Sequence, residues 1–416
     1  MDTLSSTTIA IGGGKGGVGK SVLASNLACG MAAAGRRVIL VDADLMGANI
    51  HTMFGIRYPE FTLGDFMRGR VGTLQEVLIP TPVDGLSLIC GAGDLLEVTN
   101  PNYVQKQRLL TGFADLMADI VIIDIGAGAS ITNLDFFNYS EIGIIVTSPA
   151  PTSIQNAYSF LKLAVNRRLL TMFKERAEVS QCLRRMLEGE YRARSMNEVT
   201  AAVEAIDREA ADEVRAFLGR NIYRLVANMA TPREGESLAH TFASAAYQFL
   251  GVRLPYLGSL VHSQEVERSV RSMSPLLLRP GGETTAAVMR IIQRLMGSMP
   301  TQSPAEPVKK EVAVAPPVGV PVGLALASNV QLGLNEELAH GGRTLHVQTE
   351  DLGPEKGRIL TLVFSEGRIL FSRETPYSEI TAAGDLAIAI SERVRWQQRT
   401  IMAGIKAGKL NDRLGG

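Results

Sequence analysis

The feature that most constrains this 416-residue chain is a glycine-rich segment close to its N-terminus. Residues 14–21 read Gly-Lys-Gly-Gly-Val-Gly-Lys-Ser and satisfy the pattern G-x-x-x-x-G-K-[ST]. The apolar residues 8–11 before them favour a strand, and residues 22–34 after them favour a helix. In such a strand–loop–helix unit, backbone N–H groups and the helix N-terminus surround a phosphate group. We therefore predict a phosphate-binding loop.

The loop predicts a role for each of its polar side chains. Lys20 is expected to reach the β- and γ-phosphates of a nucleoside triphosphate, and the Ser21 hydroxyl is expected to ligate Mg²⁺. A glycine-rich turn without a ligand is the alternative, which the full motif in this context disfavours. The predicted nucleotide-binding residues in the loop are Gly14, Lys15, Gly16, Gly17, Val18, Gly19, Lys20, Ser21 and Val22.

A second lysine, Lys15, lies inside the loop, although Lys20 already supplies a positive charge for the phosphates. This K-G-G-V-G-K-S segment resembles the variant loop of the MinD/ParA family of dimeric ATPases. The resemblance implies that ATP and Mg²⁺ bind here and that Lys15 reaches across a homodimer interface to the partner's nucleotide. From the residues alone, Lys15 could equally be a solvated surface lysine.

Two further predicted strands end in carboxylates. Residues 38–44 end in Asp42 and Asp44, and residues 119–124 end in Asp124, which a Gly-Ala-Gly run follows. The carboxyl ends of parallel strands border the ligand crevice of an open α/β sheet. Each aspartate alone could simply cap a helix. The resemblance implies that Asp44 lies in switch I beside the attacking water, that Asp124 ends the Walker B strand, and that the Gly-Ala-Gly run at residues 126–128 belongs to switch II.

The resemblance therefore implies two overlapping sets of site residues. The catalytic set is Lys15, Lys20, Asp44 and Asp124, and the metal-binding set is Ser21, Asp44 and Asp124.

Two later segments extend the resemblance. Residues 141–146 favour a strand, and residues 147–153 after it resemble the segment near the dimer interface, where relatives often carry a glutamate in place of Ala150. The strand predicted for residues 223–228 ends in Asn228, where MinD-like proteins place an asparagine that reads adenine; alone, it would be taken for a turn former. The similarity is greatest to the MinD-like branch that includes the regulator of flagellar number and placement.

Composition fits an enzyme of two or more domains. Apolar residues make up 46% of the chain, and 42 basic residues balance 42 acidic ones, which disfavours bulk attraction to nucleic acid. Cys29, Cys90 and Cys182 are scattered without a C-x-x-C pair, so we expect a reducing compartment and no zinc or cluster site within one chain. Neither a signal peptide nor an apolar run of membrane-spanning length is apparent. We expect a cytoplasmic protein, with peripheral attachment at the inner face of the cell membrane as the alternative.

The first predicted domain covers residues 1–297 and is a doubly wound, mainly parallel α/β sheet. Within it, residues 159–219 predict an enlarged helical segment. We expect its basic stretch at residues 166–174 to form a helix half packed on the domain. A face that binds a membrane or a partner is the less favoured alternative. Residues 291–296 are expected to close the fold, with a membrane anchor as the alternative. The candidate buried positions of the helical segment are Leu163, Leu170, Phe173, Leu183, Met186 and Leu187.

A linker rich in Pro, Val and Ala is predicted for residues 298–329, followed by a small α+β module at residues 330–416. In the module we expect strands at residues 343–349, 358–364 and 368–373, with a hairpin between the last two, and then a helix at residues 377–409. Strand alternation disfavours a metal cluster of His346, Glu350 and Asp351. The module is interpreted as a binding or dimerising unit.

Together these features predict a slow ATPase that acts as a switch, dimerises with ATP and is stimulated by a protein partner. Such a switch would position or regulate a cellular machine such as the division site, a flagellum or another polar structure. A DNA-associated segregation ATPase and an ATP-dependent scaffold with little hydrolysis are the alternatives; the balanced charge makes DNA the less favoured partner.

Overall fold

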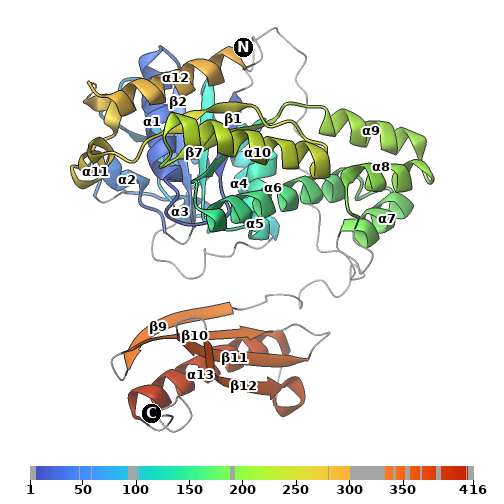
Figure 1. The fold of residues 1–416 in the computed structure, drawn as a ribbon. Coiled ribbons are helices and arrows are strands. Elements are labelled where there is room, and N and C mark those ends of the chain that lie inside the picture. The colour runs from blue at the N-terminus through green and yellow to red at the C-terminus, as the bar shows by residue number, and fades with distance from the viewer. Residues whose placement is uncertain are drawn as a thin grey trace. The chain divides into compact units, whose positions relative to one another are not determined.

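The chain forms two compact units, Met1–Pro316 and Pro317–Gly416, in a computed structural model (Figure 1). Apart from residues 298 and 299, the predicted linker lies outside the described residues. The structure describes residues 6–45, 47–57, 59–91, 101, 103–187, 193–279, 281–299, 333–340, 343–351, 357–365, 368–380, 386–408 and 410.

The first unit is built on an eight-stranded sheet in the order β3-β4-β2-β5-β1-β6-β7-β8. Every pairing is parallel except that of β3 with β4, which confirms the predicted doubly wound, mainly parallel fold. The strands are β1 (Thr7–Gly12), β2 (Val38–Ala43), β3 (Ile79–Pro80), β4 (Leu86–Ile89), β5 (Ile120–Ile125), β6 (Ile142–Thr147), β7 (Tyr223–Asn228) and β8 (Tyr256–Leu260).

Helices cover both faces of this sheet (Figure 1). Alternate residues of β2 face opposite cores: Val38 and Leu40 lie in one, and Ile39 and Val41 lie in the other. A strand buried on both faces has to be apolar throughout, which explains its continuous run of aliphatic residues. One face packs against α1 (Lys20–Ala33), α2 (Ile50–Met53) and α12 (Glu283–Gly297), and the other against α4 (Tyr103–Ala114), α5 (Ile131–Tyr139), α6 (Pro151–Met172) and α10 (Pro232–Leu250).

The predicted helical segment is present. It begins in the 22-residue α6 and continues through three shorter helices. Phe173 and Leu183 are fully buried, as predicted, whereas the prediction for Leu163 was wrong, because its side chain is 43% exposed. The remaining helices of the first unit are α3 (Leu63–Met67), α7 (Ala177–Leu187), α8 (Met196–Glu204), α9 (Arg208–Leu218) and α11 (Gln264–Arg271), with 3-10 turns η1 (Leu74–Val77) and η2 (Leu276–Leu278).

Two segments with a possible membrane role pack on the sheet instead. In the basic stretch at the end of α6, Leu169 and Phe173 are buried, so this helix is half packed on the unit, as favoured. In α12, Ile291, Ile292 and Leu295 are each at most 2% exposed. The apolar face that an anchor would insert into lipid is therefore in the core, and α12 is the last helix of the first unit. Among the described residues, no helix has the length and apolarity to cross a membrane.

The second unit is an antiparallel sheet in the order β12-β11-β10-β9, covered by one helix. The predicted hairpin is present, but the prediction missed β9 and began the last helix too early. Tyr377–Glu379 is a 3-10 turn, and the α-helix begins at Leu386. The side chains of the disfavoured metal cluster lie outside the described residues. The elements are β9 (Gly333–His340), β10 (Arg343–Asp351), β11 (Arg358–Ser365), β12 (Arg368–Pro376), η3 (Tyr377–Glu379) and α13 (Leu386–Lys406).

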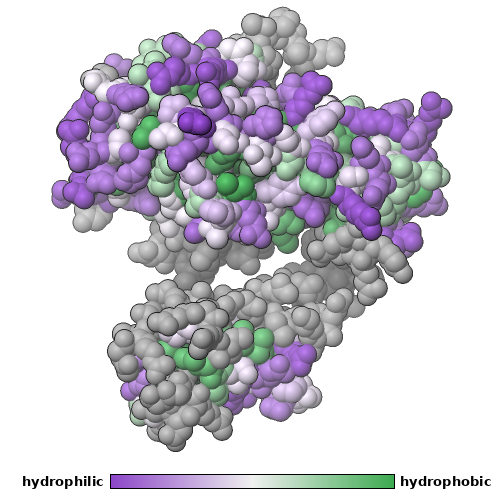
Figure 2. Space-filling model, viewed as in Figure 1, coloured by the Kyte–Doolittle hydropathy of each residue, from purple (hydrophilic) through white to green (hydrophobic). Residues whose placement is uncertain are grey.

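The visible surface of the first unit is mainly hydrophilic, with scattered hydrophobic residues (Figure 2). Large apolar side chains that remain exposed include Tyr247 and Phe249 at the end of α10. Scattered apolar residues are normal on a protein surface, so their exposure alone does not mark a site.

Candidate functional site

The predicted phosphate-binding loop connects β1 to α1 at the centre of the sheet. Its backbone is left-handed at Gly17 and at Gly19, with φ values of 75° and 87°. A Cβ atom on Gly19 would lie 2.1 Å from the amide nitrogen of Asn228, and one on Gly14 would lie 2.0 Å from the carbonyl oxygen of Asn156. The glycines are therefore required both by backbone conformation and by close packing against β7 and α6.

The two lysines of the loop occupy different environments. Lys20 opens α1 and is only 8% exposed, whereas Lys15 is on the exposed side of the loop. A buried ammonium at the start of a helix suits contact with a phosphate bound inside the loop. The exposed lysine is free to reach a group outside its own chain, as the cross-dimer prediction requires.

Asp124 lies beside the loop because of the strand register. On β5 it pairs with Ile11 of β1 on one side and with Asp42 of β2 on the other. The Ser21 hydroxyl donates a hydrogen bond of 2.6 Å to Asp124 Oδ2, across 103 residues of sequence. The other carboxylate oxygen, Oδ1, is buried without a hydrogen-bond partner. The structure thus brings together Lys20, Ser21 and Asp124, which the sequence predicted as one site.

Burial makes the negative charge of this site unfavourable. It raises the pKa of Asp124 to about 8, an effect that the neighbouring Asp42 increases and that the Ser21 hydrogen bond and Lys20 oppose. Burial also raises the pKa of Asp42 to about 7, although the Ile50 N–H donates a 2.9 Å hydrogen bond to it. A positive charge next to these two buried carboxyl groups and the unpartnered oxygen would stabilise their ionised forms.

These residues fit a magnesium ion. Mg²⁺ prefers oxygen ligands and is usually held by one or two carboxylates together with substrate phosphates. Ser21 and Asp124 supply a hydroxyl and a carboxylate in direct contact with each other. Among the described residues, no group of three or more His, Cys, Asp and Glu side chains is arranged to hold a metal without further ligands.

Asp44 lies just past β2, in the predicted switch I and next to switch II. Its Oδ1 accepts a 3.0 Å hydrogen bond from the Gly47 N–H, which closes a turn in switch I. A Cβ atom on Gly126 of switch II would lie 3.0 Å from the same oxygen. The half-buried Asp44 carboxylate therefore lies against switch II, and a side chain at position 126 would push it aside.

Asn133 is a residue of this region that the sequence analysis missed. Its amide nitrogen lies 3.2, 3.1 and 3.1 Å from the carbonyl oxygens of Gly126, Ala127 and Gly128. It belongs to the first turn of α5, where Ser130 caps the helix through a hydrogen bond from the Asn133 N–H. One side chain thus holds the whole Gly-Ala-Gly run of switch II. The sequence signal that could have identified Asn133 was the helix-capping Ser130, which stands three residues before it and shortly after the Gly-Ala-Gly run.

The other predicted positions lie around the loop. The amide nitrogen of Asn228 donates to the carbonyl of Val18 at 2.8 Å, so it fastens β7 to the loop, and its contact with adenine stays a prediction. Ala150 is exposed at the N-cap of α6, and Ser153 in the next turn accepts a hydrogen bond from the Ser148 N–H. The three cysteines are free and buried.

The ParA family model, described as that of the NUBPL iron-transfer P-loop NTPase, matches residues 5–172. Antiactivator FleN of Pseudomonas aeruginosa is 28% identical over 266 residues, which are 63% of this chain and 76% of that protein. The flagellum site-determining protein YlxH of Helicobacter pylori is 35% identical over 161 residues, 37% of this chain and about half, 52%, of that protein.

Septum site-determining protein MinD of Thermotoga maritima is 29% identical over 163 residues, which are 38% of this chain and 58% of that protein. Among solved structures, the cell division ATPase MinD of Pyrococcus furiosus aligns with 70% of this chain and 98% of its own, at 18% identity and a TM-score of 0.48. The matched residues include the loop, both switch segments and the strands that carry their carboxylates. Residues 5–172 thus match the ParA/MinD family of P-loop NTPases.

Proposed function

We propose that this protein is an ATP-hydrolysing switch in which two copies dimerise over their bound nucleotides. The observation that carries the proposal is the different exposure of two lysines in one loop: Lys20 is buried, and Lys15 is exposed. A buried lysine serves the nucleotide of its own chain. An exposed lysine four residues before Gly19 serves the nucleotide of the partner.

The proposed chemistry is slow transfer of the γ-phosphoryl group to water, which depends on positioning and charge stabilisation. Loop N–H groups and Lys20 hold the phosphates. When bound, Mg²⁺ neutralises phosphate charge, and Ser21 and Asp124 would hold it. Asp44 orients the attacking water from switch I. Asn133 holds the carbonyls of switch II, so that its backbone is ordered around the γ-phosphate.

Hydrolysis would then change the state of the dimer. Switch segments ordered by the γ-phosphate relax once it leaves, and a surface of the dimer is lost with them. Because YlxH of Helicobacter pylori is named a flagellum site-determining protein, we infer that the machine controlled by this switch is a flagellum or another polar structure. A protein partner would accelerate hydrolysis. We place the protein in the cytoplasm, at or near the inner face of the membrane.

The decisive experiment compares Lys15→Ala with Lys20→Ala. Lys20→Ala should abolish ATP binding, because no other side chain of the loop is placed to neutralise the phosphates. Lys15→Ala should keep ATP affinity within a few-fold of the parent protein but lose ATP-dependent dimers in sedimentation and lose turnover.

Lys174→Ala provides the control, since Lys174 only pairs with Glu175 at 3.6 Å beyond the end of α6. It should dimerise and hydrolyse ATP like the parent protein. Normal dimers and normal turnover in Lys15→Ala would reduce Lys15 to a surface charge and would refute the proposed dimeric switch.

A further inference from the structure

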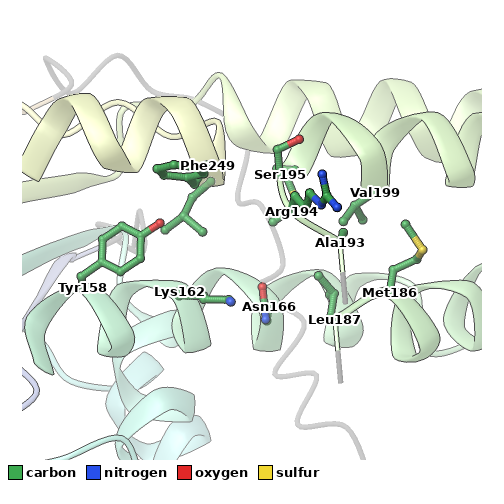
Figure 3. A pocket seen from close by; sticks show the side chains of 12 residues that line it. Tyr158, Lys162, Asn166, Met186, Leu187, Ala193, Arg194, Ser195, Val199 and Phe249 are labelled. Carbon is green, nitrogen blue, oxygen red and sulfur yellow. The ribbon is translucent and has the colours of Figure 1, made fainter. Parts of the chain in front are cut away.

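A cavity lies away from the nucleotide loop, among the helices that enlarge the first unit. It has a volume of about 250 Å³ and is enclosed by α6, α7, α8 and the C-terminal end of α10. Tyr158, Lys162 and Asn166 follow one another at intervals of four residues and so line it from one face of α6 (Figure 3). Its size suits one or two side chains rather than a whole nucleotide. We name it the α6–α8 pocket.

Asn166 is the polar group that most needs a ligand. It is 6% exposed, its Oδ1 atom is buried without a hydrogen-bond partner, and its side chain lies on the pocket side of α6 (Figure 3). A buried acceptor without a donor destabilises the fold, and buried polar groups in native proteins rarely stay unsatisfied. The ligand of this pocket therefore has to offer an N–H or O–H donor.

The charged residues of the pocket lining are cations. Lys162 comes from α6, and Arg194 comes from the segment before α8. Among the described residues, neither side chain has an ion-pair partner. A ligand carrying a carboxylate would neutralise this charge, but a simple carboxylate would bring no donor for Asn166.

Apolar side chains complete the lining. Met186 and Leu187 of α7 are partly buried, and Phe249 of α10, with 43% exposure, lies at the Tyr158 end of the pocket (Figure 3). An aliphatic or aromatic side chain that entered the pocket would cover part of this surface, and covering apolar area is favourable.

We propose that the α6–α8 pocket binds a short segment of a partner protein in which an acidic residue adjoins an apolar one. The carboxylate of the segment pairs with Lys162 and Arg194. A backbone N–H of the segment donates to Asn166 Oδ1, which explains why a peptide fits better than a free acid. The apolar side chain packs against Met186 and Leu187.

The site is distinct from the nucleotide loop, although both use α6: the Asn156 carbonyl of this helix contacts Gly14, and Asn166 lies further along it. Peptide binding is therefore measured on the full chain without nucleotide. A failure of peptide binding would then leave the proposed ATP switch untouched, and a failure of the switch would leave the pocket untouched.

The probe is a library of capped hexapeptides with Asp or Glu at the third position, Leu, Met or Phe at the fourth, and Ser, Gly or Ala elsewhere. Binding is measured by fluorescence anisotropy. The tightest member should lose at least tenfold in affinity with Lys162→Glu and with Asn166→Ala. Lys174→Glu, which reverses a charge outside the pocket, should change the affinity less than twofold. Replacing the acidic residue of the peptide by its amide should weaken binding by a similar factor.

Three results would overturn the proposal. One is that no member of the library binds, and another is that the Lys162→Glu protein binds as tightly as the parent. The third is that N-acetylaspartate alone binds the pocket as tightly as the best peptide, since a free small acid would then be the ligand. Because Asn166 is buried, its variant is compared only after its thermal transition matches that of the parent; the half-buried Lys162 supplies the test if it does not.

Discussion

Replacing Asn133 by alanine tests whether this side chain orders switch II. The amide nitrogen has two hydrogens shared among three carbonyl oxygens at 3.1–3.2 Å, so it makes the equivalent of two full hydrogen bonds. At about 0.5–1.5 kcal/mol each, their loss removes about 1–3 kcal/mol from the ordered state of the loop. If turnover needs that state, the rate falls roughly 5- to 150-fold.

The assay is phosphate release at saturating ATP, together with a titration of nucleotide affinity. Because the lost contacts act on switch II and not on the phosphate-binding loop, kcat should fall while ATP affinity changes much less. Asn133→Asp should be slower still, since it would place a carboxylate against three carbonyl oxygens.

Asn138→Ala is the matched control on the same helix. Asn138 donates a 2.9 Å hydrogen bond to the carbonyl of Ala164 on α6, so its loss removes one bond without touching switch II. We expect the variant to lose about 1 kcal/mol of stability, the usual contribution of one hydrogen bond. Its turnover should stay within about twofold of the parent, because the lost bond does not involve switch II. Equal turnover in the Asn133 and Asn138 variants would refute the positioning role.

Four further predictions follow from the same site and from the second unit. Lys20→Ala should lose ATP binding in a fluorescence titration, whereas Asp44→Ala should retain ATP-bound dimers in sedimentation while phosphate release slows; rapid release by the Asp44 variant would make that carboxylate a turn former. The pKa of Asp42 is raised by burial to about 7, so without Mg²⁺ and nucleotide the free energy of unfolding should fall as pH rises from 5 to 8, because the unfolded carboxyl ionises first. Asp124, whose pKa burial raises to about 8, contributes to the same fall. Asp42→Asn should therefore make the profile less steep in denaturant titrations without abolishing it, and an equally steep profile would contradict the assignment. The fragment of residues 330–416 should unfold cooperatively by itself, and a non-cooperative thermal melt would mean that it needs the first unit.

The nucleotide site was predictable from the sequence because its signals are local. Each strand that carries a site carboxylate is a continuous apolar run, and a parallel sheet brings the ends of such runs together. The pairing of Asp42 with Asp124 and the contact of Ser21 with Asp124 follow from that register. Once the order of strands is known, few other arrangements of these side chains are possible.

Other features depended on packing that periodicity does not encode. Leu163 and Leu170 are seven residues apart on α6 and share one face, yet Leu170 is 7% exposed and Leu163 is 43% exposed. The pattern identifies the apolar face of a helix but not how far along it the neighbouring helices reach. Likewise, β9 contains two adjacent glutamates, Glu336 and Glu337, and lies at a sheet edge, so its sequence lacks the apolar alternation of a central strand.

The buried polar groups of the nucleotide site differ from those of the second unit's helix–sheet interface in whether they have hydrogen-bond partners. In the second unit, the helix–sheet interface buries a polar network whose members are paired: Gln397 Nε2 donates to Thr361 Oγ1 at 2.9 Å, and Gln398 Nε2 donates to the Val347 carbonyl at 3.0 Å. Such a satisfied network fixes the register of a helix on a sheet without requiring a ligand. Asp124 is as deeply buried, but one of its oxygens has no partner and its pKa is raised toward the neutral form.

The contrast predicts how each region responds to ligand. A carboxylate that is unfavourable in the ligand-free fold gains stabilisation when a cation and nucleotide enter, because a ligand that binds only the folded state shifts unfolding by mass action. Mg²⁺ with nucleotide should therefore raise the unfolding temperature of the parent protein more than that of Asp124→Asn, whose neutral side chain needs no countercharge. The transition of the second unit, where Gln397 and Gln398 are already paired at the helix–sheet interface, should not move. A shift of equal size in both transitions would mean that the nucleotide stabilises the protein by another route than the charge of Asp124.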